Sequence, residues 1–291
     1  MDATTVATTP VPGWETLFPW LRAGTTRRTA DNPDRALAGR WRSVVGSWQV
    51  HGARCRVHSG VATGVCRLGE GDGHVTRSSG VLLTVTLADC VPVFVVDPVA
   101  RAVGLFHAGW RGTAAGVVES GVGTLIDAFG SDPGELVVHL GPAICEACYE
   151  VGPEVFSALG EMPPPGPAPI DLRGVIRKRA VSLGVPDGQV TTSDECTLCG
   201  DGRYYSHRRG DTGRHLGFIG ILPRAGGLRG GSGDNVGLCG GCAWMRTVES
   251  RRGSVFYLCG RHRGDPTFPK YPPLPVLRCR GFAPNPQDEP E

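Results

Sequence analysis

The chain has 291 residues, 40% of them hydrophobic, and its 30 Lys and Arg residues nearly balance its 28 Asp and Glu residues. This length predicts one or two domains with a sizeable core, and the charge gives no reason to expect nucleic acid or a membrane surface as partner. There is no apolar run of about 18 residues to span a membrane, and the first residues do not resemble a secretory signal. We therefore expect a cytoplasmic protein whose eleven cysteines are metal ligands, reactive thiols or buried thiols rather than disulfides.

The expected elements alternate between strands and helices along the chain. Residues 1–14 are expected to be disordered, and a polar turn before Ala38 leads toward a helix. β-Branched runs bounded by Gly, Asp and Pro predict strands in VVGSWQVHG, ARCRVHSG, GVLLTVTLADC, VPVFVVDP and AVGLFHAG. Helical spacing predicts a helix from near Thr113, and further segments follow as a strand in ELVVHLGPAI, a helix from Pro153, a helix in DLRGVIRKRAVSLGV, and strands in YYSHRRG and HLGFIGIL. This mixture favours an α+β or α/β sandwich.

Composition divides the remainder of the chain. Residues 15–222 form the expected main domain, and the Gly-rich stretch 223–237 has the composition of a flexible linker. Residues 238–282 have a different character and contain four cysteines, and residues 283–291 are expected to be a disordered tail.

Three residues of metal-binding types follow apolar strands. These are His51 in SWQVHG, Cys90 in TLADC and His107 in LFHAGW. If they converge, they form a plausible zinc site, and three protein ligands leave a position for water or substrate, as in catalytic zinc sites. Spacing by itself leaves a second interpretation open, in which Cys90 is a small buried residue and His107 only forms a hydrogen bond to a turn.

Several short motifs carry a resemblance to a known family. QVHG, ADCVP, HAGWRG and GPAICEACYEVG together resemble the YfiH-like family, also called the laccase-domain or polyphenol-oxidase-like family. Its members are variously labelled purine nucleoside phosphorylases and peptidoglycan editing factors. The likeness runs from about Ala23 to Leu222, although the SLNLG stretch of many members is absent here.

The resemblance implies a fold, a cofactor and an activity. The fold is a four-layer α-β-β-α sandwich, and the cofactor is zinc held by residues that match His51, Cys90 and His107. The activity is phosphorolysis of adenosine, inosine and methylthioadenosine, with adenosine deamination as a second activity. Substrates are therefore a small nucleoside and phosphate, with no nucleic acid or membrane partner.

Arginines and carboxylates near these motifs are candidates for the chemistry. Arginine binds phosphate oxygens with two parallel donors, and Arg111 is favoured because it lies close to His107; the other candidates are Arg27, Arg28, Arg208 and Arg209. Each of these could instead pair with a surface carboxylate. Asp89 is a candidate acid–base group if the strand breaks at Asp89–Cys90; otherwise it caps a turn or orients a zinc-bound histidine.

Some nearby residues keep two interpretations. Asp72 either faces the site or makes a Gly-Asp-Gly turn, and His74 is expected at the surface. The pairs Cys145–Cys148 and Cys196–Cys199 are expected to be separate reduced thiols, with a second structural zinc as the alternative. A multicopper site is excluded because eight histidines without any His-x-His pair are too few ligands.

The C-terminal segment has a metal-site pattern of its own. It is too short to build a sizeable core, so a bound metal would have to supply its folding energy. We expect a structural zinc held by Cys239, Cys242, Cys259 and Cys279, with His262 as a possible substitute ligand. Such a module could contact a protein partner; the alternative is a disordered tail with incidental cysteines.

The sequence therefore predicts a zinc-dependent purine nucleoside phosphorylase. One rival is a thiol hydrolase or amidase acting on peptidoglycan precursors, with Cys90 as nucleophile and His107 as its base. Another rival is a non-catalytic binding protein that uses zinc structurally.

Overall fold

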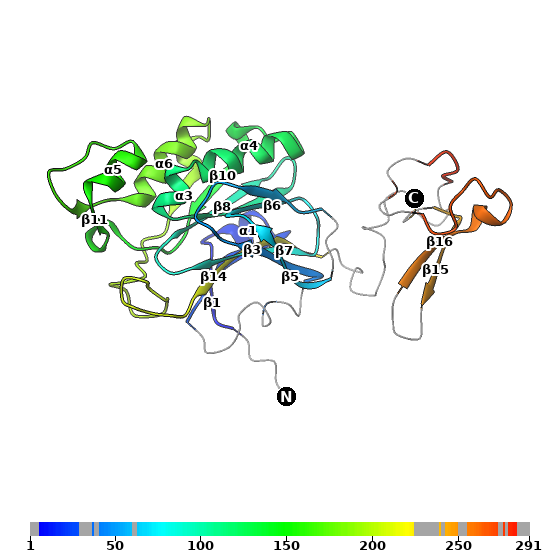
Figure 1. Ribbon diagram of the computed structural model, residues 1–291, viewed down its shortest axis with the longest axis horizontal. Helices are drawn as coiled ribbons and strands as arrows, with labels where there is room; N and C mark the ends of the chain where they lie inside the picture. The colour runs from blue at the N-terminus through cyan, green and yellow to red at the C-terminus, as the bar shows by residue number, and fades with distance from the viewer. Residues whose placement is uncertain are drawn as a thin grey trace. The chain divides into compact units, whose positions relative to one another are not determined.

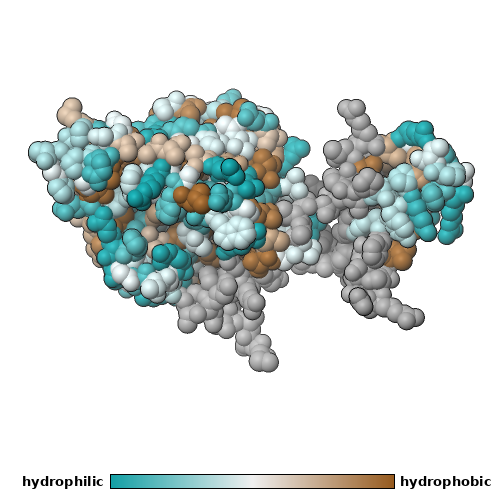
Figure 2. Space-filling model, viewed as in Figure 1, coloured by the Kyte–Doolittle hydropathy of each residue, from teal (hydrophilic) through white to brown (hydrophobic). Residues whose placement is uncertain are grey.

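The computed structural model describes residues 6–28, 37, 41–59, 63–223, 239, 242–249, 255–272, 276 and 279–283. The chain divides into two compact units, Met1–Arg224 and Ala225–Glu291. Within the described ranges, no helix is long and apolar enough to cross a membrane. On the face of the first unit drawn in Figure 2, apolar side chains lie in separate groups among polar ones.

Two six-stranded sheets form the first unit (Figure 1). In spatial order, the first sheet consists of β1 (Thr8–Pro10), β2 (Leu21–Thr26), β14 (His215–Ile221), β7 (Val81–Leu87), β3 (Ser43–Trp48) and β5 (Gly64–Glu70). The second consists of β13 (Val190–Thr192), β10 (Val137–Leu140), β8 (Val91–Asp97), β9 (Ala102–Ala108), β6 (Gly73–Thr76) and β4 (Cys55–Val57). A small ribbon pairs β11 (Glu150–Val151) with β12 (Ala168–Pro169).

The central strands are buried on both faces, which explains their nearly continuous apolar sequences. In β8, Val93 and Val95 pack under the helices, whereas Phe94 and Val96 point to the core between the two sheets. Leu83 of β7 reaches that inter-sheet core from the opposite side. Side chains alternate between the faces of a strand, so each central strand contributes to two layers of packing.

Helices cover the outer face of the second sheet (Figure 1). They are α3 (Trp110–Ala114), α4 (Val117–Phe129), α5 (Pro153–Leu159) and α6 (Leu172–Ser182), while a short α1 (Trp14–Leu17) precedes β2. On the outer face of the first sheet, Leu37 and Trp41 pack against Val44, Leu82 and Phe218. The predicted α+β sandwich is therefore confirmed; most of the helix expected before Ala38 lies outside the described residues.

The predicted disorder of residues 1–14 is wrong for residues 8–14. β1 pairs with β2, and the side chains of Val11 and Trp14 are each only 3% exposed. The Trp14 ring makes edge contacts with Phe18 and Phe94, so burial of a large aromatic side chain fixes this segment. Residues 1–5 lie outside the described residues.

Three further local predictions need correction. YYSHRRG forms turns and not a strand, since side chains rather than a neighbouring strand accept hydrogen bonds from its backbone, as at Ser206 and Arg208. The helix expected from Thr113 begins at Trp110 and is interrupted at Gly116, whose φ of 87° is left-handed. The strand β2 lies in a segment where a polar turn was expected.

The second unit contains a hairpin of β15 (Met245–Glu249) and β16 (Val255–Cys259), followed by the 3₁₀ helix η6 (Gly260–Arg263). The expected linker 223–237 lies outside the described residues except for Pro223, and so does the expected tail 283–291 except for Ala283.

Candidate functional site

Three strand ends bring His51, Cys90 and His107 together. The strands β3 and β7 are parallel, so His51 and Cys90, which follow them, emerge at the same edge of the first sheet. In the second sheet β8 pairs antiparallel with β9, and Pro92 lies opposite His107. The metal-ligating atoms of the three residues lie within 4.8 Å of one another. The three residues therefore converge, and they form a cluster of two imidazoles and one thiol.

The backbone is strained at one of these positions and beside another. His51 has a φ of 57° and Asp89 a φ of 80°, both in the left-handed region that residues with a side chain rarely adopt. The predicted break at Asp89–Cys90 is present, because both residues lie in the turn between β7 and β8. Strain of this kind is commonly found where a backbone must aim a functional side chain.

A buried carboxylate, that of Asp72, organises the cluster. Its Oδ1 accepts hydrogen bonds from His107 Nδ1 at 2.9 Å and from the His51 backbone N–H at 3.0 Å. Its Oδ2 accepts from the backbone N–H groups of Val50 at 3.1 Å and Gly52 at 2.9 Å. Because Nδ1 of His107 donates to Asp72, its Nε2 is left as the nitrogen that can bind a metal ion. Of the two interpretations of Asp72, the structure therefore supports the one in which it faces the site.

Electrostatics in the cluster favour a thiolate. Burial raises the pKa of Cys90, but the charge of His107 and hydrogen bonds from His107 and His51 outweigh it and lower the pKa to about 6. Burial lowers the pKa of His107, but the Cys90 charge and the Asp72 hydrogen bond outweigh it and raise the pKa to about 9. Burial likewise disfavours ionised Asp72, whereas its hydrogen bonds from His107 and the backbone lower its pKa overall. A thiolate is the form of cysteine that binds a metal ion or attacks an electrophile.

Gly109 leaves room for this cluster. A Cβ atom at this position would lie 2.8 Å from Cys90 Sγ and 3.3 Å from His51 Cδ2. The Gly109 backbone is in the ordinary extended region, with a φ of −80°, so the glycine is needed for space and not for conformation. The glycine of HAGWRG is thus explained by the close approach of the thiol.

Asp89 holds a turn and does not orient a histidine, because its carboxylate accepts hydrogen bonds from other groups. Its Oδ1 accepts from the Thr197 hydroxyl at 2.6 Å, and its Oδ2 accepts from the Ser206 hydroxyl at 3.1 Å and the Arg208 backbone N–H at 2.8 Å. The carboxylate that orients a histidine is Asp72 instead. Asp89 fixes the turn of residues 206–208 beside Cys90.

The candidate arginines lie in different surroundings. Arg111 is exposed, its guanidinium lies 4.4 Å from the Trp110 ring centre, and among the described residues it has no ion-pair partner. Arg208 lies over the Tyr149 ring and donates to the Glu150 carbonyl. By contrast, Arg28 is paired with Asp211 at 2.6 Å, as Arg209 is at 2.9 Å, and Arg27 donates weakly to Thr9. Arg111 and Arg208 are therefore the better placed to bind an anion.

Tyr149 belongs to the site and was not anticipated from the sequence. Its side chain is buried, and burial together with the charges of Cys90 and Asp89 raises its pKa to about 12, although Arg208 and Arg111 oppose this rise. A neutral hydroxyl therefore lies near the thiol and both arginines. The only signal in the sequence was its place in the motif GPAICEACYEVG.

Two other expectations are wrong. His74 is fully buried, not at the surface, and its ring nitrogen lies 2.9 Å from that of His58. Cys145, Cys148, Cys196 and Cys199 are not packed separately, because their four sulfurs lie within 4.8 Å of one another. The chain brings the two Cys-x-x-Cys motifs to one place.

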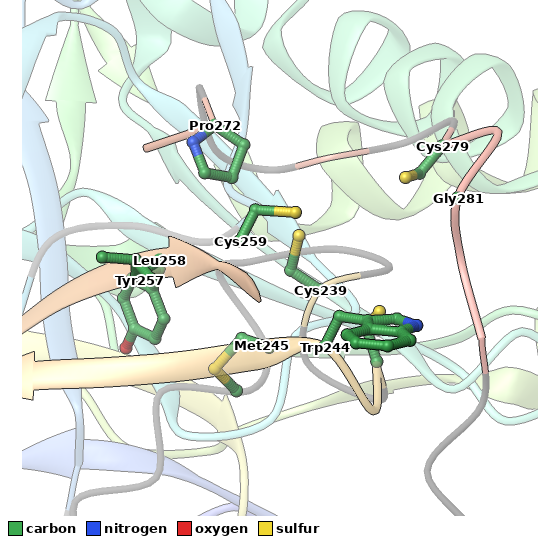
Figure 3. A pocket seen from close by; sticks show the side chains of 10 residues that line it. Cys239, Trp244, Met245, Tyr257, Leu258, Cys259, Pro272, Cys279 and Gly281 are labelled. Atoms are coloured by element: carbon green, nitrogen blue, oxygen red, sulfur yellow. The ribbon is translucent and has the colours of Figure 1, made fainter. Parts of the chain in front are cut away.

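The four C-terminal cysteines surround one pocket, which Met245, Leu258 and Pro272 also line. Figure 3 shows the sulfurs of Cys239 and Cys259 pointing toward one another, with Cys279 across the same pocket. His262 is not among the lining residues, and its Nδ1 lies 2.7 Å from the Phe268 carbonyl.

A family model described as "Multi-copper polyphenol oxidoreductase laccase" matches residues 26–222. Purine nucleoside phosphorylase YlmD of Geobacillus stearothermophilus is 40% identical over 162 residues, which cover 51% of this chain and 59% of that protein. Purine nucleoside phosphorylase ORF3 of Streptomyces griseus is 36% identical over 184 residues, covering 60% and 73%. Adenosine deaminase RL5 of an unknown prokaryotic organism is 35% identical over 164 residues, covering 53% and 62%. The chain thus spans about three-fifths of the length of the YlmD and RL5 relatives.

Solved structures resemble the fold. Hypothetical protein YfiH of Bacillus licheniformis aligns with a TM-score of 0.65 at 28% identity, covering 76% of this chain and 98% of that one. YlmD of Geobacillus stearothermophilus aligns with a TM-score of 0.62 at 31% identity, covering 70% and 93%.

Proposed function

The chain belongs to the multi-copper polyphenol oxidoreductase laccase family, and from that premise we propose that it is a purine nucleoside phosphorylase and not a laccase. Relatives that carry the phosphorylase name match about half or more of the chain, and eight histidines without a His-x-His pair do not suit a multicopper centre. The proposed substrates are adenosine, inosine and methylthioadenosine with phosphate. A phosphate oxygen bonds to ribose C1′ while the bond from C1′ to the base breaks, and the base leaves with that electron pair and gains a proton.

The observation that carries this proposal is the cluster of His51, Cys90 and His107 beside the buried Asp72. Two imidazoles and a thiolate are a donor set that zinc accepts, and three protein ligands leave a fourth position open. Gly109 provides the space that this set requires. Bound zinc would supply a Lewis acid beside the reacting groups.

The remaining roles fall to side chains around the cluster. Arg111, with no ion-pair partner in the described part of the chain, would bind the phosphate, and Arg208, which lies over the Tyr149 ring, would assist it. The neutral Tyr149 hydroxyl can donate a hydrogen bond to a substrate oxygen. For Asp89 we propose a positioning role, since its hydrogen bonds hold the turn that carries Arg208.

Product analysis on the three nucleosides, with and without phosphate, tests the proposal. Free base that appears only with phosphate supports it. Inosine formed from adenosine without phosphate would instead identify a deaminase, the activity in the name of one relative. Metal binding without turnover of any nucleoside would favour a non-catalytic binding protein. When variants of the site are assayed in the same way, Lys178→Ala, a change at an exposed residue of α6, serves as the control.

A thiol hydrolase is the second candidate, because Asp72, His107 and Cys90 are connected in the order of a Cys-His-Asp triad. Metal removal separates the two functions. A chelator should abolish phosphorolysis but raise thiol-dependent hydrolysis of an amide substrate, such as a peptidoglycan precursor. We expect either enzyme to act in the cytoplasm, where free thiols persist.

For the second unit we propose a zinc-bound module that contacts a protein partner. The family match ends at residue 222, before this unit begins. Four cysteines that line one pocket in so short a segment are the residue type of a structural zinc site, but among the described residues their sulfurs do not form a group with all ligand atoms within 4.8 Å, so a bound ion would have to draw them together. Full-length protein with Cys239→Ser and Cys242→Ser should contain one zinc ion fewer per chain.

A further inference from the structure

Four cysteines of the first unit, all outside the proposed active site, form a closed cluster. Cys145 and Cys148 lie at the 3₁₀ helix η3 (Glu146–Cys148), and Cys196 and Cys199 lie in the loop after β13. All four sulfurs lie within 4.8 Å of one another, and those of Cys145 and Cys199 are 3.8 Å apart. A tetrahedral zinc ion with Zn–S bonds of about 2.3 Å has sulfur–sulfur edges of about 3.8 Å. The spacing therefore suits one tetrahedral metal ion.

Backbone contacts hold the two loops in this arrangement. Ala143 and Cys196 form an isolated parallel bridge, and the Thr197 N–H donates to the Ala143 carbonyl at 3.1 Å. After Cys199 the chain turns sharply, since a Cβ at Gly200 would lie 2.5 Å from the Cys196 carbonyl oxygen. Each pair thus projects its sulfurs toward the other, and backbone hydrogen bonds hold the two loops side by side.

One sulfur is surrounded by hydrogen-bond donors. The backbone N–H groups of Cys145, Leu198 and Cys199 point at Cys196 Sγ, with distances of 3.3, 3.4 and 3.5 Å. A neutral thiol is a weak acceptor, and so is a sulfur in a disulfide. Three amide donors are the environment that stabilises a thiolate bound to a metal ion. This feature favours metal ligation over a pair of disulfides.

We propose that Cys145, Cys148, Cys196 and Cys199 bind a structural zinc ion. Four thiolates leave no open position, so the ion would stabilise structure and would not take part in the reaction. The ion would also help to fix the proposed active site, because both loops adjoin that site. Thr197 donates to Asp89, and Tyr149 directly follows Cys148. The zinc ion would thereby tie together two loops that the chain separates by about fifty residues.

Zinc content of the full chain tests this site without any nucleoside, so its outcome is separate from that of the proposed function. The parent protein carries Cys239→Ser and Cys242→Ser, which removes the C-terminal candidate site. Cys196→Ser with Cys199→Ser should then remove one further zinc ion per chain. Cys66→Ser, a change at a cysteine outside these groups, should leave the zinc content unchanged.

A milder variant guards against loss of the fold. Cys199 is exposed, so Cys199→Ala should keep the far-ultraviolet circular dichroism of the parent. It should release zinc at a lower chelator concentration, and the cobalt-substituted protein should lose part of its thiolate charge-transfer absorption. Zinc content and chelator resistance equal to the parent in both variants would overturn the site. Two disulfides would also overturn the site. They would make the four sulfurs resistant to alkylation and would lower the intact mass by four hydrogens.

Discussion

Replacing Asp72 by asparagine should weaken zinc binding at His51, Cys90 and His107 by about 10–100-fold. The carboxylate places two oxygens against four donors: Oδ1 faces the His107 ring and the His51 N–H, and Oδ2 faces two further backbone N–H groups. An asparagine has one acceptor oxygen and one NH₂ group. In either orientation its NH₂ must face two donors, so the His107 ring or the loop of residues 50–52 loses its partner.

The same substitution should lower the free energy of unfolding. Asp72 is fully buried, so water cannot replace the lost hydrogen bonds. A buried donor without a partner costs about 1–3 kcal/mol, which gives a loss of about 2–6 kcal/mol for two donors. Denaturant unfolding gives the stability, and competition with a chelator gives the zinc affinity.

Asp97→Asn is the matched control. Asp97 is also buried, but a single oxygen accepts both of its backbone bonds, from Val99 and Ala100 at 2.8 Å each. An asparagine oxygen can accept both, so stability should fall by about 1 kcal/mol or less and zinc affinity should not change. Wild-type zinc affinity and stability in Asp72→Asn would refute the role assigned to this carboxylate.

Three other predictions concern the site and its surroundings. Gly109→Ala should reduce zinc affinity at least about tenfold because its Cβ meets the Cys90 sulfur, whereas Gly123→Ala, in open space on α4, should raise stability by about 0.5–1 kcal/mol; equal zinc affinities in the two variants would contradict this. Cys90→Ala should lose both the bound zinc and phosphate-dependent release of base, and a variant that keeps both would remove Cys90 from the site. Acid should destabilise the fold, because burial lowers the pKa of four histidines, to about 4 for His58 and His139 and about 3 for His74 and His215. Below their ordinary pKa of 6.5 the unfolded chain binds protons that the folded chain does not, so each histidine should remove about 1.4 kcal/mol per pH unit as the pH falls toward its folded value. Unfolding curves at pH 7 and pH 5 with the same midpoint would contradict this assignment.

The sequence alone determined the elements whose patterns are local. β-Branched runs identified the central strands. Pro153 predicted the start of a helix, and in the structure a helix begins at that residue. The positions of His51, Cys90 and His107 could be read because polar, metal-binding residue types stand out at the ends of apolar runs. Each of these signals depends on neighbours within a few residues, which is the range over which sequence patterns are informative.

Only the tertiary structure decided which distant groups meet. Asp72, and not Asp89, orients His107, because pairing of β6 with β9 brings the start of one strand to the end of the other. The two Cys-x-x-Cys motifs form one cluster because a bridge joins Ala143 to Cys196. Such contacts follow from how strands from separate parts of the chain pair and pack. No local pattern specifies them, so the ligand candidates came from the sequence and their partners came from the fold.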